Sequence, residues 1–275
     1  MAIARDLIGL GIGVLVSSAL GWSATMPAGA QLSPPPEETL PLRIDIESTA
    51  SDTQERADRL LRAAMEFVSN QQTLRFEAEI TYDNVFSTGE KAQYTAYQET
   101  TLQRPNLLRT DYSGNLRATR FFYDGRSATL QDTDRQFYAT SPAPPTVDET
   151  IVALRERFNV RLPLSNLLSS DPYALIAPQI ESSRYLGLSV VNGLPCHSLL
   201  FVGKDVNFQI WIVADGDPVP QKLVINYKNL PGSPQYSALF VNWDFSPAIA
   251  PDTFAFVAPE GVGRVRFIPS TDDLP

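Results

Sequence analysis

The sequence has very few of the residues on which catalytic and metal sites usually depend. Among 275 residues there is one cysteine, Cys196, and one histidine, His197. A single cysteine excludes an intramolecular disulfide, and one residue of each type is too few for a zinc site. Neighbouring side chains on a strand point to opposite faces, so Cys196 and His197 are not expected to pair as nucleophile and base. We expect a structural histidine, a buried cysteine and no catalytic residue, metal or cofactor.

Acidic residues are plentiful, but their spacing favours no particular site. The best local candidate for a hard cation is the pair Asp215 and Asp217, and the run Asp-Gly-Asp-Pro is more simply a turn. A hydrolase built from two carboxylates is kept as the third hypothesis for function, because the sequence does not give the separation of its acids.

The chain also lacks an excess of positive charge. It has 31 Asp and Glu against 22 Lys and Arg, and a net charge of −9. This balance disfavours nucleic acid or an anionic membrane surface as a main partner.

No apolar run is long enough to be a convincing membrane span, which takes about 20 residues. The stretch Leu7–Leu20 follows Arg5 and precedes Ala28-Gly29-Ala30, a small-x-small pattern typical of signal peptidase sites. We expect residues 1–30 to be a cleavable signal peptide for the periplasm, with an uncleaved anchor as the alternative. No cysteine follows the apolar core at the expected start, Gln31, so a lipoprotein is not expected.

The sequence contains many runs in which apolar and polar residues alternate. From Leu74 to Tyr82 every even position is apolar and every odd one polar, which is typical of a strand with one buried face. Similar runs, bounded by turn residues such as Asp124-Gly125 and Asn192-Gly193, predict strands at 74–84, 91–104, 107–113, 116–123, 127–132, 136–140, 183–191, 194–203, 206–214, 219–229 and 235–245.

Three helices are predicted beside these strands. The first begins near Asp52 as its cap and carries an apolar stripe: Ala57, Leu60, Leu61, Ala64, Met65 and Val68. The second follows Thr146, which with Glu149 forms a capping box. The third follows Asp171-Pro172 and runs through Ile176.

These elements predict an α+β fold that is mostly antiparallel β. We expect one strongly curved sheet of about ten or eleven strands, a half-open barrel, covered by about three helices. The expected domains are the signal peptide, a Pro-rich tether without packed structure at 31–50, a single domain at 51–268 and a tail at 269–275.

Several motifs occur in an order that resembles a family of predicted periplasmic bacterial proteins with the fold of the lipoprotein-localisation factors. The motifs are Phe122-Tyr123-Asp124-Gly125, Leu162-Pro163-Leu164-Ser165-Asn166-Leu167-Leu168, Val191-Asn192-Gly193-Leu194-Pro195-Cys196-His197, Gln209-Ile210-Trp211-Ile212, Pro220-Gln221-Lys222-Leu223, Phe254-Ala255-Phe256 and Pro259-Glu260-Gly261. The resemblance covers roughly residues 52–262 and includes the carrier LolA, its receptor LolB and the sigma-factor regulator RseB.

This resemblance implies a half-open barrel whose helices form a lid over an apolar hollow that takes acyl chains. It supplies no catalytic residues, because the activity of the closer family is not established. The acylated cysteine of the LolB receptor has no counterpart here, which argues against that role.

A sheet with only three helices to cover it has more apolar face than lid, and the remainder predicts a hydrophobic groove. The expected lining comes from the inward side of the central strands: Ile80, Tyr82, Phe121, Tyr123, Ile210, Ile212, Leu223 and Ile225. A register slip of one residue would exchange the two faces.

The leading hypothesis is therefore a non-enzymatic periplasmic protein, expected to be a monomer, that binds a lipid or a lipoprotein acyl chain. The alternative is a protein-interaction or sensor module, of the sigma-factor-regulator type, with an envelope protein as its partner.

Overall fold

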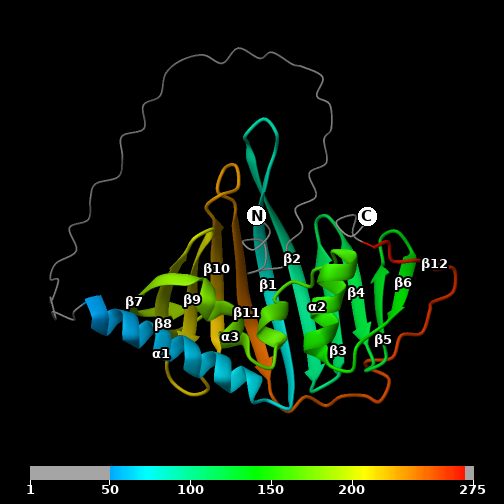
Figure 1. The fold of residues 1–275 in the computed structure, drawn as a ribbon, viewed down its shortest axis with the longest axis horizontal. Helices are drawn as coiled ribbons and strands as arrows, with labels where there is room; N and C mark the ends of the chain where they lie inside the picture. The colour runs from blue at the N-terminus through cyan, green and yellow to red at the C-terminus, as the bar shows by residue number, and fades with distance from the viewer. Residues whose placement is uncertain (1–49, 270–275) are drawn as a thin grey trace.

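A single twelve-stranded sheet organises the molecule. The computed structural model describes residues 50–269, and the strand order is β12-β6-β5-β4-β3-β2-β1-β11-β10-β9-β8-β7. The two ends of this order do not pair with each other, so the sheet is curved but open (Figure 1). Every neighbouring pair is antiparallel except β12 with β6. The prediction of one curved, mostly antiparallel sheet is confirmed.

The first six strands form a meander. Their bounds are β1 Thr73–Val85, β2 Lys91–Gln103, β3 Leu107–Gly114, β4 Ala118–Tyr123, β5 Ser127–Asp132 and β6 Phe137–Pro142. In β1 the side chains of Leu74, Phe76, Ala78 and Ile80 are all at most 1 % exposed, while the odd positions between them face outward. The alternation in the sequence therefore becomes one buried and one wet face.

Two α-helices and two short 3₁₀ turns follow the first meander: α2 Val147–Phe158, η2 Ser165–Leu168, α3 Pro172–Ile176 and η3 Ala177–Gln179. The Thr146 hydroxyl accepts a hydrogen bond from the amide of Glu149 at 3.2 Å, so the predicted capping box forms. The Asp171 carboxylate accepts from the amide of Ala174 at 2.9 Å and caps α3 as predicted. These helices lie on the same side of the sheet as α1 (Figure 1).

A second meander completes most of the sheet: β7 Ile180–Val191, β8 Leu194–Gly203, β9 Val206–Val213, β10 Pro220–Tyr227 and β11 Gln235–Asp244. Its last strand returns to the first meander, because β11 pairs antiparallel with β1. This pairing runs from Arg75 opposite Asp244 to Tyr82 opposite Tyr236. A bulge between Glu77 and Ala78 shifts this register.

The helix α1, Ala50–Ser69, lies across β7, β8 and β9. Its predicted apolar stripe is confirmed: Ala57, Leu61, Ala64, Met65 and Val68 are fully buried, and Leu60 packs against the same core. Burying one such aliphatic side chain contributes about 1.5–3 kcal/mol, so this stripe holds the helix on the sheet. Asp52 lies inside the first turn of α1, so its prediction as the preceding cap is wrong.

The chain after β11 forms a C-terminal strap, residues 246–262, over the outer face of β3 to β6. The Arg109 guanidinium donates to the carbonyl of Thr253, and the Phe256 ring packs on Phe122 and Tyr138. The strap then leads into β12, Gly263–Val265, which pairs parallel with β6 at the edge of the sheet. Neither the strap nor β12 was expected from the sequence.

The other predicted strands are present, with ends that differ by up to three residues. The largest difference is at β7, which begins at Ile180 instead of residue 183, because η3 leads directly into it. The predicted signal peptide, the cleavage site before Gln31 and the tether up to residue 49 lie outside the described residues, as does the tail from residue 270.

Candidate ligand-binding site

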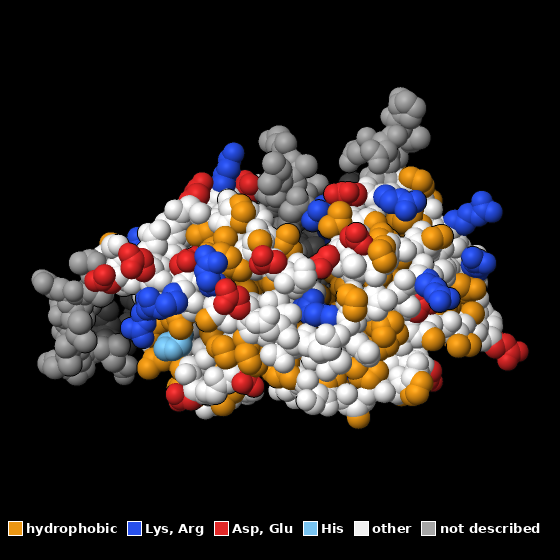
Figure 2. All heavy atoms as spheres, turned by 60° about the horizontal axis from the view of Figure 1, so that its bottom comes forward, with side chains coloured by type: hydrophobic (Ala, Val, Ile, Leu, Met, Phe, Trp, Pro, Cys, Tyr) orange, Lys and Arg blue, Asp and Glu red, His pale blue; other side chains and the backbone are white. Residues whose placement is uncertain are grey.

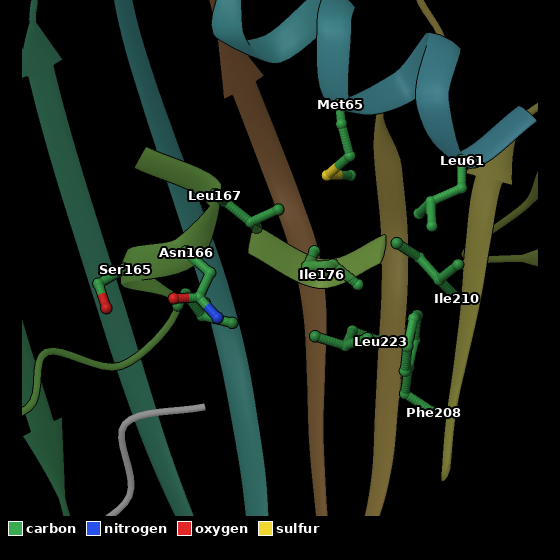
Figure 3. A pocket seen from close by; sticks show the side chains of 10 residues that line it. Leu61, Met65, Ser165, Asn166, Leu167, Ile176, Phe208, Ile210 and Leu223 are labelled. Carbon is green, nitrogen blue, oxygen red and sulfur yellow. The ribbon is translucent and has the colours of Figure 1, made fainter. Parts of the chain in front are cut away.

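An apolar cavity lies between the helices and the second meander. Its volume is about 50 Å³, room for a few water molecules, and it is lined by Leu61, Met65, Leu164, Ser165, Asn166, Leu167, Ile176, Phe208, Ile210 and Leu223. In Figure 3 the side chains of Leu61 and Met65 point from α1 toward Ile176, Ile210 and Leu223. Eight of the ten lining side chains are apolar, which favours an apolar occupant.

The floor of the cavity follows from strand register. Leu223 of β10 pairs with Ile210 of β9, and Phe208 lies two residues from Ile210 on the same face. These side chains meet because paired residues of neighbouring strands project to the same side of the sheet.

The roof combines α1 with η2 and α3. The Tyr173 hydroxyl of α3 donates to the Asp58 carboxylate of α1, and the Arg62 guanidinium lies 3.9 Å from the centre of the Tyr173 ring. Burial, and then the hydrogen bond to Asp58, raise the pKa of Tyr173, so it stays a donor at neutral pH. These contacts join α1 and α3 to each other rather than to the sheet.

Arg104 holds one end of this roof to the sheet. Its guanidinium donates to the carbonyl oxygens of Gln71, Leu168 and Ser169 at 2.9–3.2 Å. One side chain from the turn after β2 thus fixes both the end of η2 and the chain after α1. Burial lowers the pKa of Arg104, but the ordinary pKa of arginine is so high that the side chain stays charged.

A second, smaller hollow of about 20 Å³ adjoins the first and shares Ser165 and Asn166 with it. Its other lining residues are Ile151, Arg155, Val160, Arg161 and Leu162. The two hollows therefore differ in character, one apolar and the other with two cationic side chains.

All eight residues predicted to line the groove belong to, or pack against, the hydrophobic core between sheet and helices: Ile80, Tyr82, Phe121, Tyr123, Ile210, Ile212, Leu223 and Ile225. Only Ile210 and Leu223 line the cavity. Ile80, Tyr82, Phe121, Tyr123, Ile212 and Ile225 are packed elsewhere in the core, and the Tyr123 hydroxyl donates to the carbonyl of Pro144 at 2.6 Å.

The strand-based prediction missed Phe208 and every residue of the roof. The sequence contained signals for the roof, because Leu61 and Met65 belong to the predicted helical stripe and Leu164 to Leu167 belong to one of the motifs that carry the family resemblance. Phe208 is two residues before Ile210 on the same strand, so its side chain was expected on the same face.

Cys196 and His197 lie on opposite faces of β8, as their adjacency in a strand requires. The Cys196 thiol is buried and contacts the carbonyl of Leu194, and burial raises its pKa. The His197 Nδ1 atom lies 3.1 Å from the Tyr185 hydroxyl, and the Arg56 guanidinium of α1 lies 4.0 Å from the centre of the Tyr185 ring. Burial and then Arg56 lower the pKa of His197, which makes it neutral at pH 7.

Acidic and basic side chains are interspersed over the face of the molecule shown in Figure 2, with apolar ones between them. Within residues 50–269 no group of three or more His, Cys, Asp or Glu side chains is placed to hold a metal ion. Among the same residues no helix is both long and apolar enough to cross a membrane.

Several solved structures are similar to this chain. Crystal structures of LprF from Mycobacterium bovis (12 % identity, TM-score 0.44, 74 % of this chain and 99 % of that one), the lipoprotein LppX from Mycobacterium tuberculosis (10 %, 0.39, 71 % and 98 %) and a LolA superfamily protein from Nitrosomonas europaea (9 %, 0.36, 73 % and 97 %) are among the similar structures. No curated protein sequence matches. Residues 57–268 match the model of a family described as predicted periplasmic protein, DUF2092, which confirms the family expected from the motifs.

Proposed function

The chain belongs to the DUF2092 family of predicted periplasmic proteins, and we propose that it is a non-enzymatic binding protein for a hydrophobic ligand. The ligand, a lipid or a lipoprotein acyl chain, is held between the sheet and the lid formed by α1, η2 and α3. The observation that carries this proposal is the cavity beneath the lid, whose walls are apolar on both sides.

The size of the cavity implies that the lid moves when the ligand enters. About 50 Å³ holds a few water molecules and is too small for an acyl chain of ten or more carbons. The contact of Tyr173 with Asp58 and Arg62 joins α1 and α3, so we expect these helices to move outward together. The sheet serves as the fixed wall.

The direct test is lipid mass spectrometry on an organic extract of protein purified from the periplasm. We expect one class of lipid at near-stoichiometric amount. An interior that is consistently empty, with no lipid in the extract, would count against the proposal.

A cavity-filling variant localises the binding. Leu223→Trp places a larger side chain in the cavity, and we expect the affinity for the apolar fluorophore N-phenyl-1-naphthylamine to fall at least about 10-fold. The matched control is Leu239→Trp on the neighbouring strand, which faces outward beside Lys222 and Glu79. Equal loss in the two variants would show that the fluorophore binds elsewhere.

The edge strand β7 supports protein interaction as a second candidate function. Leu186, Leu188 and Val190 are 50 %, 65 % and 73 % exposed, and within residues 50–269 no strand pairs with the free side of β7. An exposed apolar edge is the kind of surface to which an extended peptide adds as a further strand. Recovery of one defined envelope polypeptide with the protein, lost in Leu188→Lys and accompanied by no lipid, would favour this function over ligand carriage.

A further inference from the structure

Three buried polar atoms on the helix-facing side of the central strands have no hydrogen-bond partner among the described residues. They are the hydroxyls of Tyr227 and Tyr236 and the Oε1 atom of Gln98. Tyr236 is 1 % exposed and Gln98 is 0 % exposed. Buried polar atoms are rarely left unpaired, because desolvation without a hydrogen bond is costly. A ligand atom would supply the missing partner.

The register places these tyrosines on the same face of the sheet as the apolar cavity and within an acyl chain's length of it. Phe208, which lines the cavity, pairs with Ile225, and Ile225 pairs on its other side with Tyr236. Strands lie about 4.8 Å apart, so Tyr236 lies about 10 Å from Phe208 across the sheet. Tyr227 follows the cavity residue Leu223 by four positions on the same face, about 13 Å along the strand. Both distances fit within the length of a medium acyl chain.

The tyrosines are hydrogen-bond donors at neutral pH. Burial raises the pKa of Tyr227 to about 12, against a smaller opposing effect of the Arg161 charge. Burial, and then the neighbouring Tyr112 and Tyr227, raise the pKa of Tyr236 well above its ordinary value. Two neighbouring protonated hydroxyls, with the Arg161 guanidinium near Tyr227, make a local environment that favours an oxygen acceptor.

The second hollow continues this polar region toward the lid. It contains Arg161 and shares Ser165 and Asn166 with the apolar cavity, so the two hollows border the same short segment of η2. The Gln98 amide donates to the carbonyl of Pro163 at 3.2 Å, which fixes the loop carrying these residues over β2. The helix-facing side of the sheet is therefore apolar under α1 and carries these few unpaired polar atoms among the apolar side chains of the central strands.

We propose that the ligand is an acyl chain whose carboxyl or ester oxygen accepts hydrogen bonds from Tyr227 and Tyr236, with its hydrocarbon part in the cavity under α1. This inference rests on the proposed function and adds the chemistry of the ligand head. A free fatty acid and an acyl ester share the carbonyl oxygen, and the experiment separates them.

The test compares three probes on the full mature chain. N-phenyl-1-naphthylamine reports the apolar cavity alone, and dodecanoate and methyl dodecanoate are measured by its displacement. The double variant Tyr227→Phe/Tyr236→Phe keeps both rings and removes both hydroxyls. We expect its affinity for the acyl probes to fall about 10-fold or more, while the affinity for the fluorophore stays the same. The control is Tyr138→Phe, whose ring packs on Phe256 at the opposite face.

The outcomes discriminate clearly. Loss for both acyl probes supports an ester or acid head, and loss for dodecanoate alone supports a free carboxylate. Fluorophore binding without any effect of the double variant on the acyl probes overturns the inference and leaves the proposed function intact. Absence of binding for all three probes in the unchanged protein overturns both.

Thermal unfolding of the ligand-free protein gives a second readout. Removing an unpaired buried hydroxyl should raise the unfolding midpoint of Tyr236→Phe, since the desolvation cost disappears. A lowered midpoint together with unchanged acyl affinity would assign the hydroxyl a structural role, met by ordered water, and overturn the inference.

Discussion

The two meanders of the sheet carry the same alternating pattern and are buried in different ways. The second, β7 to β11, is covered on its inner face by α1, and most of its buried inner side chains are aliphatic or aromatic, such as Leu199, Phe201 and Ile210. The first, β1 to β6, has polar side chains buried on its inner face, including Gln98, Thr100, Thr110 and Asp132. Its outer face is covered as well, by the C-terminal strap.

Alternation in the sequence predicts burial correctly only for strands that are covered on one face. In β9 the burial alternates strictly, because only one face is covered. In β4 the three residues Phe121, Phe122 and Tyr123 are all buried, because helices cover one face and the strap covers the other. An unbroken apolar run thus marks a strand covered on both sides.

The largest effect is expected for replacing a buried phenylalanine by alanine. The same substitution under α1 and under the C-terminal strap compares how tightly the two segments pack on the sheet. Phe201→Ala removes a fully buried ring that stacks on Phe208 under α1, and we expect it to lower the free energy of unfolding by about 3–5 kcal/mol. Phe122→Ala, beneath the strap, should cost about 1–3 kcal/mol, because an irregular segment can settle into the space. Urea denaturation measures both. Equal costs would mean that the strap packs as rigidly as the helix.

An intermediate effect is expected where the first meander is joined to the helical roof that covers the second. Arg104→Met removes three charge-assisted hydrogen bonds to the carbonyls of Gln71, Leu168 and Ser169, and should lower the free energy of unfolding by about 2–3 kcal/mol. Amide hydrogen exchange should accelerate first in η2. Arg104→Lys keeps the charge without the planar fork and should fall between the two proteins; full stability in either variant would contradict this role.

The smallest effect concerns pH and belongs to the second meander alone. The pKa of His197 is lowered below its ordinary value of 6.5 by burial and Arg56, with Asp215 opposing. The unfolded chain therefore binds more protons than the fold below about pH 6.5, so stability falls as the pH decreases from there. Tyr185, Arg56 and Asp215 face this group. His197→Gln should show a flatter dependence between pH 7 and 5 in denaturation experiments, and an unchanged slope would assign the dependence to carboxylates.

Much of the fold follows from local sequence patterns. Period-two alternation predicts eleven strands, and turn pairs such as Asn192-Gly193 place the connections, since Asn192 and Gly193 both have positive φ. The capping residues Thr146 and Asp171 start α2 and α3 as expected. Local propensity and tertiary structure agree at these positions.

The strap and β12 could not be predicted in this way. Residues 246–262 have neither helical nor strand periodicity, and their position depends on distant aromatic contacts with Phe122 and Tyr138. The three exposed residues of β12 are too few to form a pattern. Only the run Phe121-Phe122-Tyr123 gave a sign that something would cover the outer face.

For the candidate site, the alternation of side chains along the strands correctly predicted which residues face the core. It did not predict where in the core the cavity lies. Which inner side chains border a cavity depends on how closely the lid packs, as Ile212 and Ile225 show by being fully enclosed next to Ile210 and Leu223. The distance between lid and sheet depends on α1 and η2 together, so it could not be predicted from any single segment of the sequence.

The pairing of β1 with β11 has a consequence for the order of assembly. Each meander is built from contacts between sequence neighbours, which close rapidly because the loops are short. The seam between Arg75 and Asp244 joins opposite ends of the described chain and forms only after β11 has been made. The first meander can therefore form while the edge of β1 that pairs with β11 is still unpaired. We expect the slow phase of refolding to be the closing of this seam, detectable as late amide protection in β1 and β11 alone.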